Sequence, residues 1–243
     1  MKKVAYYGTL ILLVGVFLFS AYQIGDYLLE KHKSDVLMNE ASKFVSVETD
    51  DKNKEENKDP ERIQVDFDKL HEQNEDIVAW LYCANTKLNY PVVQAADNDY
   101  YLYRLLDGSY NRNGTIFMDY RNHADMSDDN TLIHGHHMRS GAMFGALVEY
   151  KKQAFYDEHP YIYLMTPEKN YRLNLLAGCV VEHDSDIYTT EISDDQLSYY
   201  MSHSMFATKE EYQGGRIVTL STCSYEYEDA RFVVLGELIE LKD

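Results

Sequence analysis

The sequence predicts a mainly β protein, a closed or nearly closed barrel of about eight strands, with N-terminal helices and a helix between late strands. From Lys87 onward, short apolar and β-branched segments alternate with turns that contain Gly, Asn, Asp or Pro. Only two segments of that region have a helical pattern. The chain has 243 residues and 22 tyrosines, which suits one substantial domain with extensive half-buried sheet.

The composition is that of an acidic globular protein. The chain has 23 Lys and Arg against 41 Asp and Glu, for a formal net charge of −18. Such a surface repels phosphate backbones, so we expect no nucleic-acid partner.

The first element is an apolar run. Residues 4–24 contain no charged side chain and follow Lys2 and Lys3. At a rise of about 1.5 Å per residue, a helix of this length crosses the core of a bilayer. Residues 20–23 make a poor cleavage site, so we expect residues 1–25 to form a cytoplasmic tip and an uncleaved, single-pass signal anchor. By the positive-inside rule, the two lysines place the N-terminus in the cytoplasm and the rest of the chain outside the cell membrane.

Residues 26–61 are expected to connect this anchor to the domain. Apolar residues recur at a loosely helical spacing over 26–47, which predicts a juxtamembrane helix. Residues 48–61 contain no apolar side chain and predict a solvated polar linker. The extracellular domain, which is large enough to be catalytic, is therefore expected to span residues 62–243.

Within the domain, the elements follow in order. Residues 67–81 begin as a helix and end in an apolar segment around Trp80. Strands are expected at 88–93, 115–119, 131–136, 161–165, 171–182, 216–222 and 232–241. Ser193 and Gln196 form a capping box that opens a late helix, and a second helix is expected over 143–156.

The three cysteines are Cys83, Cys179 and Cys223, an odd number that leaves at least one thiol without an intramolecular disulfide. Their spacing matches no zinc-finger or CxxC pattern. Cys223 ends the apolar run 217–223, and a strand end is a rigid place from which to present a nucleophile. Taken alone, Cys223 has a second interpretation as a buried structural residue.

Three histidines supply partners for a thiol. Strand alternation places His134 and His136 on one face and His137 on the other. A nucleophilic cysteine needs such a neighbour, because its thiol is mostly protonated at neutral pH. The same histidines with Cys223 leave open a zinc site. The acidic residues 125–130 lack the pattern of an EF-hand and indicate a solvated loop.

Arg231 follows Cys223 after a short acid-rich connection. If the two residues face each other on antiparallel strands, the guanidinium lies at the same rim as the thiol. There it can stabilise an oxyanion or orient a substrate carbonyl. The alternative is a surface arginine that neutralises Glu226, Glu228 and Asp229.

These residues resemble a known family. Thr-Leu-Ser-Thr-Cys at 219–223, Gly-His at 135–136 and Arg231 are similar to motifs of the sortases, the membrane-anchored cysteine transpeptidases of Gram-positive bacteria. Further segments resemble the class B branch, in its order, at 74–81, 89–94, 97–102 and 114–122. The resemblance covers about residues 67–241 and implies a sortase-type β-barrel.

The resemblance implies roles for individual residues. Cys223 would be the nucleophile, His136 the acid and base, and Arg231 the group that stabilises the oxyanion or orients the substrate. The residues expected to contact the peptide are Asn98, Leu102, His134, Ser221 and Thr222. His134 stands where class B members usually carry tyrosine. No metal or cofactor is expected.

The resemblance also implies an activity and partners. The enzyme would cleave the C-terminal sorting signal of secreted surface proteins, of an Asn-Pro-x-Thr type, through a thioester. It would transfer the acyl group to an amine of peptidoglycan or of its lipid-linked precursor. The alternatives are a class B pilin polymerase, a zinc-dependent extracellular hydrolase, and a non-catalytic adhesion domain that binds through its tyrosines.

Overall fold

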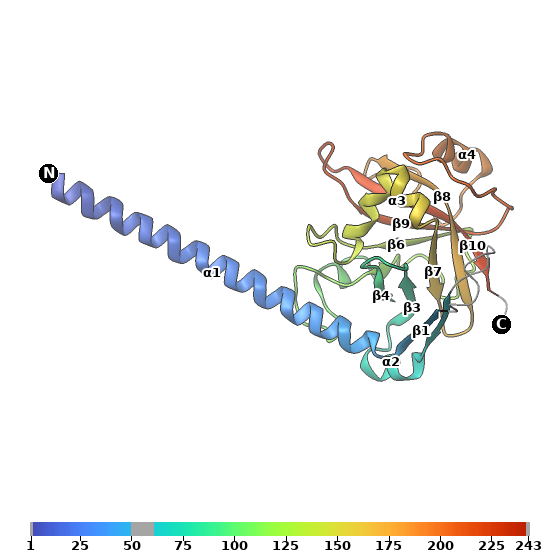
Figure 1. Cartoon of the computed structure of the whole chain (residues 1–243), viewed down its shortest axis with the longest axis horizontal. Coiled ribbons are helices and arrows are strands. Elements are labelled where there is room, and N and C mark those ends of the chain that lie inside the picture. The colour runs from blue at the N-terminus through green and yellow to red at the C-terminus, as the bar shows by residue number, and fades with distance from the viewer. Residues whose placement is uncertain (1, 50–60, 242–243) are drawn as a thin grey trace.

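The computed structural model describes residues 2–49 and 61–241, and consists of a long N-terminal helix beside a β-barrel (Figure 1). The helix α1 spans Lys2–Ser42 without interruption. Its apolar side chains over 10–19 are exposed, whereas Ser34, Met38 and Ala41 are buried against the barrel. Among the described residues, the helical stretch Tyr6–Ser42 is long and apolar enough to cross a membrane by length and composition.

The expected anchor helix and juxtamembrane helix are thus one element. Residues 45–47 were expected to be helical and residues 48–49 and 61 to be linker; both expectations were wrong, because these residues belong to strands. Strand β1 (Val45–Thr49) pairs antiparallel with β2 (Glu61–Val65). Val45 and Val47 in β1, and Ile63 and Val65 in β2, each lie two residues apart and pack on the core, which favours strands over the end of a helix. The polar ends of both strands continue the ladder, because backbone hydrogen bonds require no apolar side chain. The remainder of the expected linker, 50–60, lies outside the described residues.

Helix α2 (Phe67–Gln73) begins where expected. The Asp66 side chain accepts a hydrogen bond from the Lys69 amide at 3.1 Å and caps the helix. Phe67 and Leu70 are buried, which fixes α2 against the barrel.

The barrel is closed, with the strand order β10-β8-β7-β3-β4-β5-β6-β9. Its strands are β3 (Ile77–Tyr82), β4 (Asn89–Val93), β5 (Phe117–Met118), β6 (Asn130–His134), β7 (Tyr161–Met165), β8 (Asn170–Val181), β9 (Ile217–Cys223) and β10 (Arg231–Glu240). Trp80, Phe144 and Phe232 are among the largest fully buried side chains of the core. The predicted fold class, a closed barrel of about eight strands with N-terminal helices and a late helix, is confirmed.

Short helices connect the strands. The segment expected to be one helix over 143–156 divides into the 3₁₀ helix η2 (Phe144–Lys151) and the α-helix α3 (Gln153–Glu158). A further 3₁₀ turn, η1 (Tyr101–Tyr103), lies between β4 and β5. The late helix α4 (Asp194–Ser202) has the predicted capping box, in which Ser193 Oγ accepts from the Gln196 amide at 3.3 Å.

The neighbours of β9 decide where the site lies. β9 runs parallel to β6 and antiparallel to β10. The C-terminal ends of β6 and β9 therefore meet the start of β10 at one rim of the barrel. This rim carries the histidines, Cys223 and Arg231.

Candidate active site

Cys223 is the last residue of β9 and is partly exposed. Cys83 and Cys179 are buried, and all three thiols are free of disulfides. Burial raises the pKa of the Cys179 thiol to about 11, so Cys179 remains protonated at neutral pH. Cys83 lies in the core with its Sγ 3.6 Å from the Tyr150 hydroxyl. Cys223 is thus the thiol that a dissolved reactant can reach.

Arg231 is the first residue of β10, and its Cα is paired with that of Cys223. The two residues therefore share the rim in the way the sequence predicted. The guanidinium donates hydrogen bonds to the carbonyl oxygens of Asp229 and Ala230, at 3.0 and 3.1 Å. No ion pair among the described residues joins Arg231 to Glu226 or another acid, so the alternative of a charge-neutralising surface arginine is not supported.

His136 follows the end of β6. His134 is the register partner of Ser221, and the Gly135 amide then donates to the Ser221 carbonyl at 3.1 Å. The Thr222 hydroxyl donates to the Gly135 carbonyl at 2.7 Å, which holds the two chains together beyond the ladder. His136 directly follows Gly135 and so lies at the rim where β9 ends in Cys223.

One hydrogen bond shows which nitrogen of the His136 ring carries a proton. Its Nε2 lies 2.7 Å from the Leu102 carbonyl oxygen. A carbonyl oxygen only accepts hydrogen bonds, so Nε2 carries the proton of this bond. Nδ1 is then the nitrogen that remains to exchange a proton with a reactant.

His137 was expected to face away from the site, and the structure differs. Its Nδ1 donates to the carbonyl oxygen of Cys223 at 3.0 Å, and its ring centroid lies 5.1 Å from that of Tyr225. Because β6 ends at His134, strand alternation no longer governs the residues that follow. His137 thus holds the main chain at Cys223.

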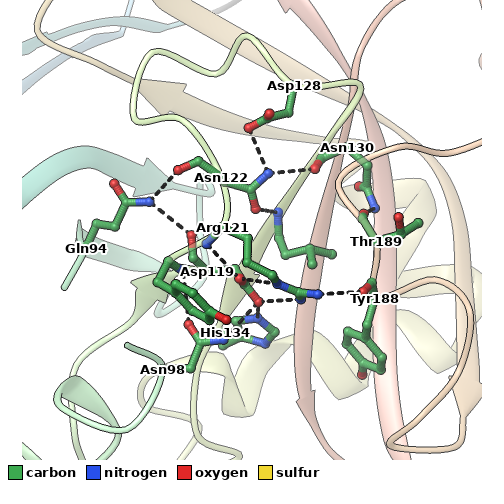
Figure 2. Close-up of polar contacts among 12 residues, drawn as sticks. Gln94, Asn98, Asp119, Arg121, Asn122, Asp128, Asn130, His134, Tyr188 and Thr189 are labelled. Atoms are coloured by element: carbon green, nitrogen blue, oxygen red, sulfur yellow. Dashed lines mark hydrogen bonds and ion pairs between the residues drawn. The ribbon is translucent and has the colours of Figure 1, made fainter. Parts of the chain in front are cut away.

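A buried carboxylate organises the adjacent wall of the rim (Figure 2). Asp119 is 1% exposed and accepts from Nε and Nη2 of Arg121, both at 2.8 Å. It also accepts from Asn98 Nδ2 at 2.9 Å and from His134 Nε2 at 3.2 Å. Burial alone would raise the pKa of Asp119, but the hydrogen bonds from Arg121, His134 and Asn98 outweigh burial and hold this pKa well below its usual range.

Tyr188 connects this wall to β9. Its hydroxyl is 2.9 Å from Ser221 Oγ, and its ring stacks on His134 with centroids 6.2 Å apart. Arg121 Nη1 donates to the Tyr188 carbonyl at 3.3 Å (Figure 2). Burial raises the pKa of the Tyr188 phenol.

The structure therefore brings some of the predicted peptide-contacting residues together. Asn98, His134 and Ser221 belong to the cluster around Asp119 and Tyr188. Leu102 contributes its carbonyl to His136, whereas the buried Thr222 side chain bonds to Gly135 and offers no open surface.

The sequence did not single out four features of the rim: Asp119, Arg121, Tyr188 and the inward contact of His137. Asp119 and Arg121 carry opposite charges two positions apart at the end of a strand, and that spacing was an available signal. Nothing in the loop after β8 distinguishes Tyr188 from its neighbours.

The zinc alternative needs His134, His136 and Cys223 around one ion. In the described ranges, no group of three or more His, Cys, Asp or Glu side chains has such an arrangement. His134 Nε2 is bonded to Asp119 and His136 Nε2 to Leu102, so each points an N–H at another acceptor.

The fold and rim define the class of the protein. The sortase domain family matches residues 81–239. The chain belongs to this family, whose members are cysteine transpeptidases.

Its relatives narrow the assignment to sortase B. The sortase B of Listeria monocytogenes is 34% identical over 98% of this chain and 99% of its own length. Bacillus anthracis sortase B in complex with AAEK2 is 31% identical with a TM-score of 0.72, over 87% of this chain and 98% of that one.

Two solved complexes are also similar. The Staphylococcus aureus sortase B–substrate complex has a TM-score of 0.68 and 32% identity, over 72% of this chain and 85% of that one. A sortase B complexed with triglycine has the same TM-score and identity, over 72% and 86% of the two chains. The resemblance read from the sequence motifs is confirmed.

Proposed function

We propose that the chain cleaves a C-terminal sorting signal of secreted surface proteins and transfers the acyl group to a cell-wall amine. The observation that carries the proposal is the rim itself, where a partly exposed thiol is paired in register with Arg231 and His136 follows the end of the neighbouring strand β6. The solved substrate complex of S. aureus sortase B supports a peptide substrate, and the triglycine complex supports an amine acceptor.

The proposed reaction has two steps. The Cys223 thiol passes its proton to Nδ1 of His136, and the resulting thiolate attacks the carbonyl carbon of threonine in the signal, while Arg231 and backbone amides stabilise the oxyanion. The carbon–nitrogen bond then breaks, and the leaving amine takes a proton from Nδ1 of His136. An incoming amine attacks the thioester, passes a proton back through His136, and releases the thiol with a new amide bond.

The peptide groove is proposed to run past Asn98, Leu102, His134 and Ser221, with Thr222 fixing the strand end behind it. By analogy with the class B branch, the signal is proposed to be of the Asn-Pro-x-Thr type. The acceptor is proposed to be peptidoglycan or its lipid-linked precursor, and no metal or cofactor takes part.

The proposed organisation has an anchor over residues 1–25, a connecting segment over 26–61 and a catalytic domain over 62–243. The exposed apolar surface of α1 supports a single-pass anchor. Lys2 and Lys3, which precede it, favour an N-terminus in the cytoplasm and a barrel outside.

The experiment is a panel of quenched peptides with Asn-Pro-x-Thr and Leu-Pro-x-Thr motifs, each with and without triglycine. We expect cleavage of the Asn-Pro-x-Thr peptide, a ligated product with triglycine, and loss of both in Cys223→Ala. The matched control is Cys179→Ala, which removes a buried thiol and should retain turnover. Turnover in Cys223→Ala would refute the proposal, and preference for a lysine side-chain amine over triglycine would instead favour the pilin polymerase.

A further inference from the structure

We infer that residues 26–34 of α1 position His136, because they hold the rim loop, residues 101–115, whose Leu102 carbonyl accepts the His136 hydrogen bond. This inference rests on the proposed role of His136 as proton donor and acceptor. α1 lies beside the segment between β4 and β5 in Figure 1.

The first link joins the helix to the rim loop through charges. Nε of Arg112 donates to Glu30 Oε2 at 2.5 Å, and Nη2 of Arg112 donates to Asp26. Lys33 lies one turn further along the helix, with its Nζ 2.9 Å from Asp107 Oδ2. The ion pairs therefore bind both ends of the 107–112 segment to one face of α1.

The second link is Asn111, which is 1% exposed. Its Nδ2 donates to the backbone carbonyl of Glu30 at 2.9 Å, and its Oδ1 accepts from the Asn113 amide at 2.9 Å. Its own amide donates to the Tyr103 carbonyl at 2.9 Å. A buried amide with all these bonds fixes the rim loop relative to the helix, because each lost partner would leave a polar group unsatisfied.

The third link runs from Asn111 to the acceptor of His136. The Gly114 amide donates to the Asn111 carbonyl at 3.1 Å. Gly114 has a φ of +57°, and a Cβ built there would lie 2.4 Å from the Leu102 carbonyl oxygen. The backbone at 114 is therefore packed directly against the atom that holds Nε2 of His136.

These contacts predict an effect on rate more than on stability. Exposed ion pairs contribute about 0–1 kcal/mol to folding. A displacement of a catalytic group by 1 Å, in contrast, reduces the rate by up to about 10²-fold. Loss of the helix contact should thus lower kcat, with little change in KM or in the melting temperature.

The test uses the full chain in detergent micelles, with the quenched Asn-Pro-x-Thr peptide and triglycine. Arg112→Glu reverses the charge at the contact. Arg112→Glu combined with Asp26→Lys and Glu30→Lys restores opposite charges. The matched control is Lys169→Glu, which reverses an exposed charge paired with Glu240.

We expect Arg112→Glu to lower kcat by about tenfold or more, with KM and melting temperature close to the wild type. The triple variant should recover most of kcat, and Lys169→Glu should match the wild type. An unchanged kcat in Arg112→Glu, a loss confined to KM, or no recovery in the triple variant would overturn the inference.

A second measurement does not depend on turnover. Nitrogen NMR of the His136 ring, assigned with His136→Gln, reports the hydrogen bond of Nε2. We expect this bond to be weakened in Arg112→Glu and regained in the triple variant, and an unchanged ring signal in Arg112→Glu would overturn the inference. Absence of thiol-dependent turnover in the wild type would refute the proposed function instead, and the ring signal would still decide whether the helix positions His136.

Discussion

The His136 ring donates through Nε2 to Leu102, so its chemistry depends on Nδ1. Replacing the ring removes the proposed proton relay while Cys223 and the barrel remain. We expect His136→Ala to lower kcat/KM by about 10²–10⁴-fold, as is typical for the loss of a general acid and base. The control is His137→Ala, which removes a bond to a backbone carbonyl and should cost less. If His137→Ala is the more damaging change, the assignment of the two rings is reversed.

Arg231 allows charge and geometry to be separated. Lysine keeps the charge but loses the planar fork of donors. If the guanidinium donates to the oxyanion, Arg231→Lys should lower kcat/KM by more than about tenfold, since one such donor typically contributes 10²–10³ in rate. Thermal unfolding measured alongside should show an intact fold. Near-wild-type turnover in Arg231→Lys would remove Arg231 from the reaction.

Asp119 predicts a pH effect on stability. Its folded-state pKa is held below its usual range, so its contribution to the free energy of unfolding is complete above about pH 4 and is lost as the pH falls further. Asp119→Asn should cost about 2 kcal/mol or more at neutral pH, because hydrogen bonds to a charged group are lost. The variant should also show a flatter decline in stability below pH 4 than the wild type. Urea unfolding at several pH values measures both effects, and parallel pH curves would contradict this account.

At the same scale, the sequence predicted that the proposed reactive residues share one rim, but it did not predict the residues that hold this rim in place. Cys223 and Arg231 lie at strand ends and His136 lies two residues past one, all within local motifs, so their shared rim follows from the strand register. Asp119 and Tyr188 meet only because β5, β6 and the loop after β8 converge in space. Such a contact depends on tertiary packing, which no local pattern encodes.

Among the elements, the rim loop requires a residue without a side chain at position 114. Alanine there would meet both a positive φ and the Leu102 carbonyl oxygen at 2.4 Å. We expect Gly114→Ala to displace that carbonyl and to lower kcat by at least about tenfold. Gly214→Ala is the control, because it also has a positive φ but no neighbour within 4 Å of the added Cβ. Equal activity of the two variants would show that the close approach has no role.

The strands were predicted well because alternation and turn residues are local signals. The predicted range 161–165 coincides with β7, and the other barrel strands that were predicted overlap the observed ones. The failures lie between the apolar run and the barrel. Residues 45–47 were expected to end a helix and residues 48–49 to begin the linker, whereas the structure pairs them with the strand that contains Ile63 and Val65. Strand pairing across an intervening segment therefore escaped the sequence pattern.

For the whole molecule, α1 and β1 extend the folded unit beyond residues 62–243. Met38 and Ala41 belong to the core, and β1 pairs antiparallel with β2. A chain that begins at residue 26 should melt several degrees higher than one that begins at residue 62, because the shorter chain loses buried apolar area and a strand pair. Differential scanning calorimetry of the two fragments decides this. Equal melting temperatures would place the folding boundary at residue 62.

The uninterrupted helix has a consequence for how the enzyme would meet its substrates. With the proposed anchor in a bilayer, the first charged contact to the barrel, at Asp26, lies two residues beyond the apolar run that ends at Ile24. The helix is unbroken between these two points, so the Cys223 thiol would lie at a fixed height above the bilayer. The same side of the barrel would then always face the lipid. The donor and the acceptor would both have to present their reacting groups at that height above the membrane. The rigid helix would thus favour reactants whose reacting groups lie at this height, in addition to the sequence preference of the groove.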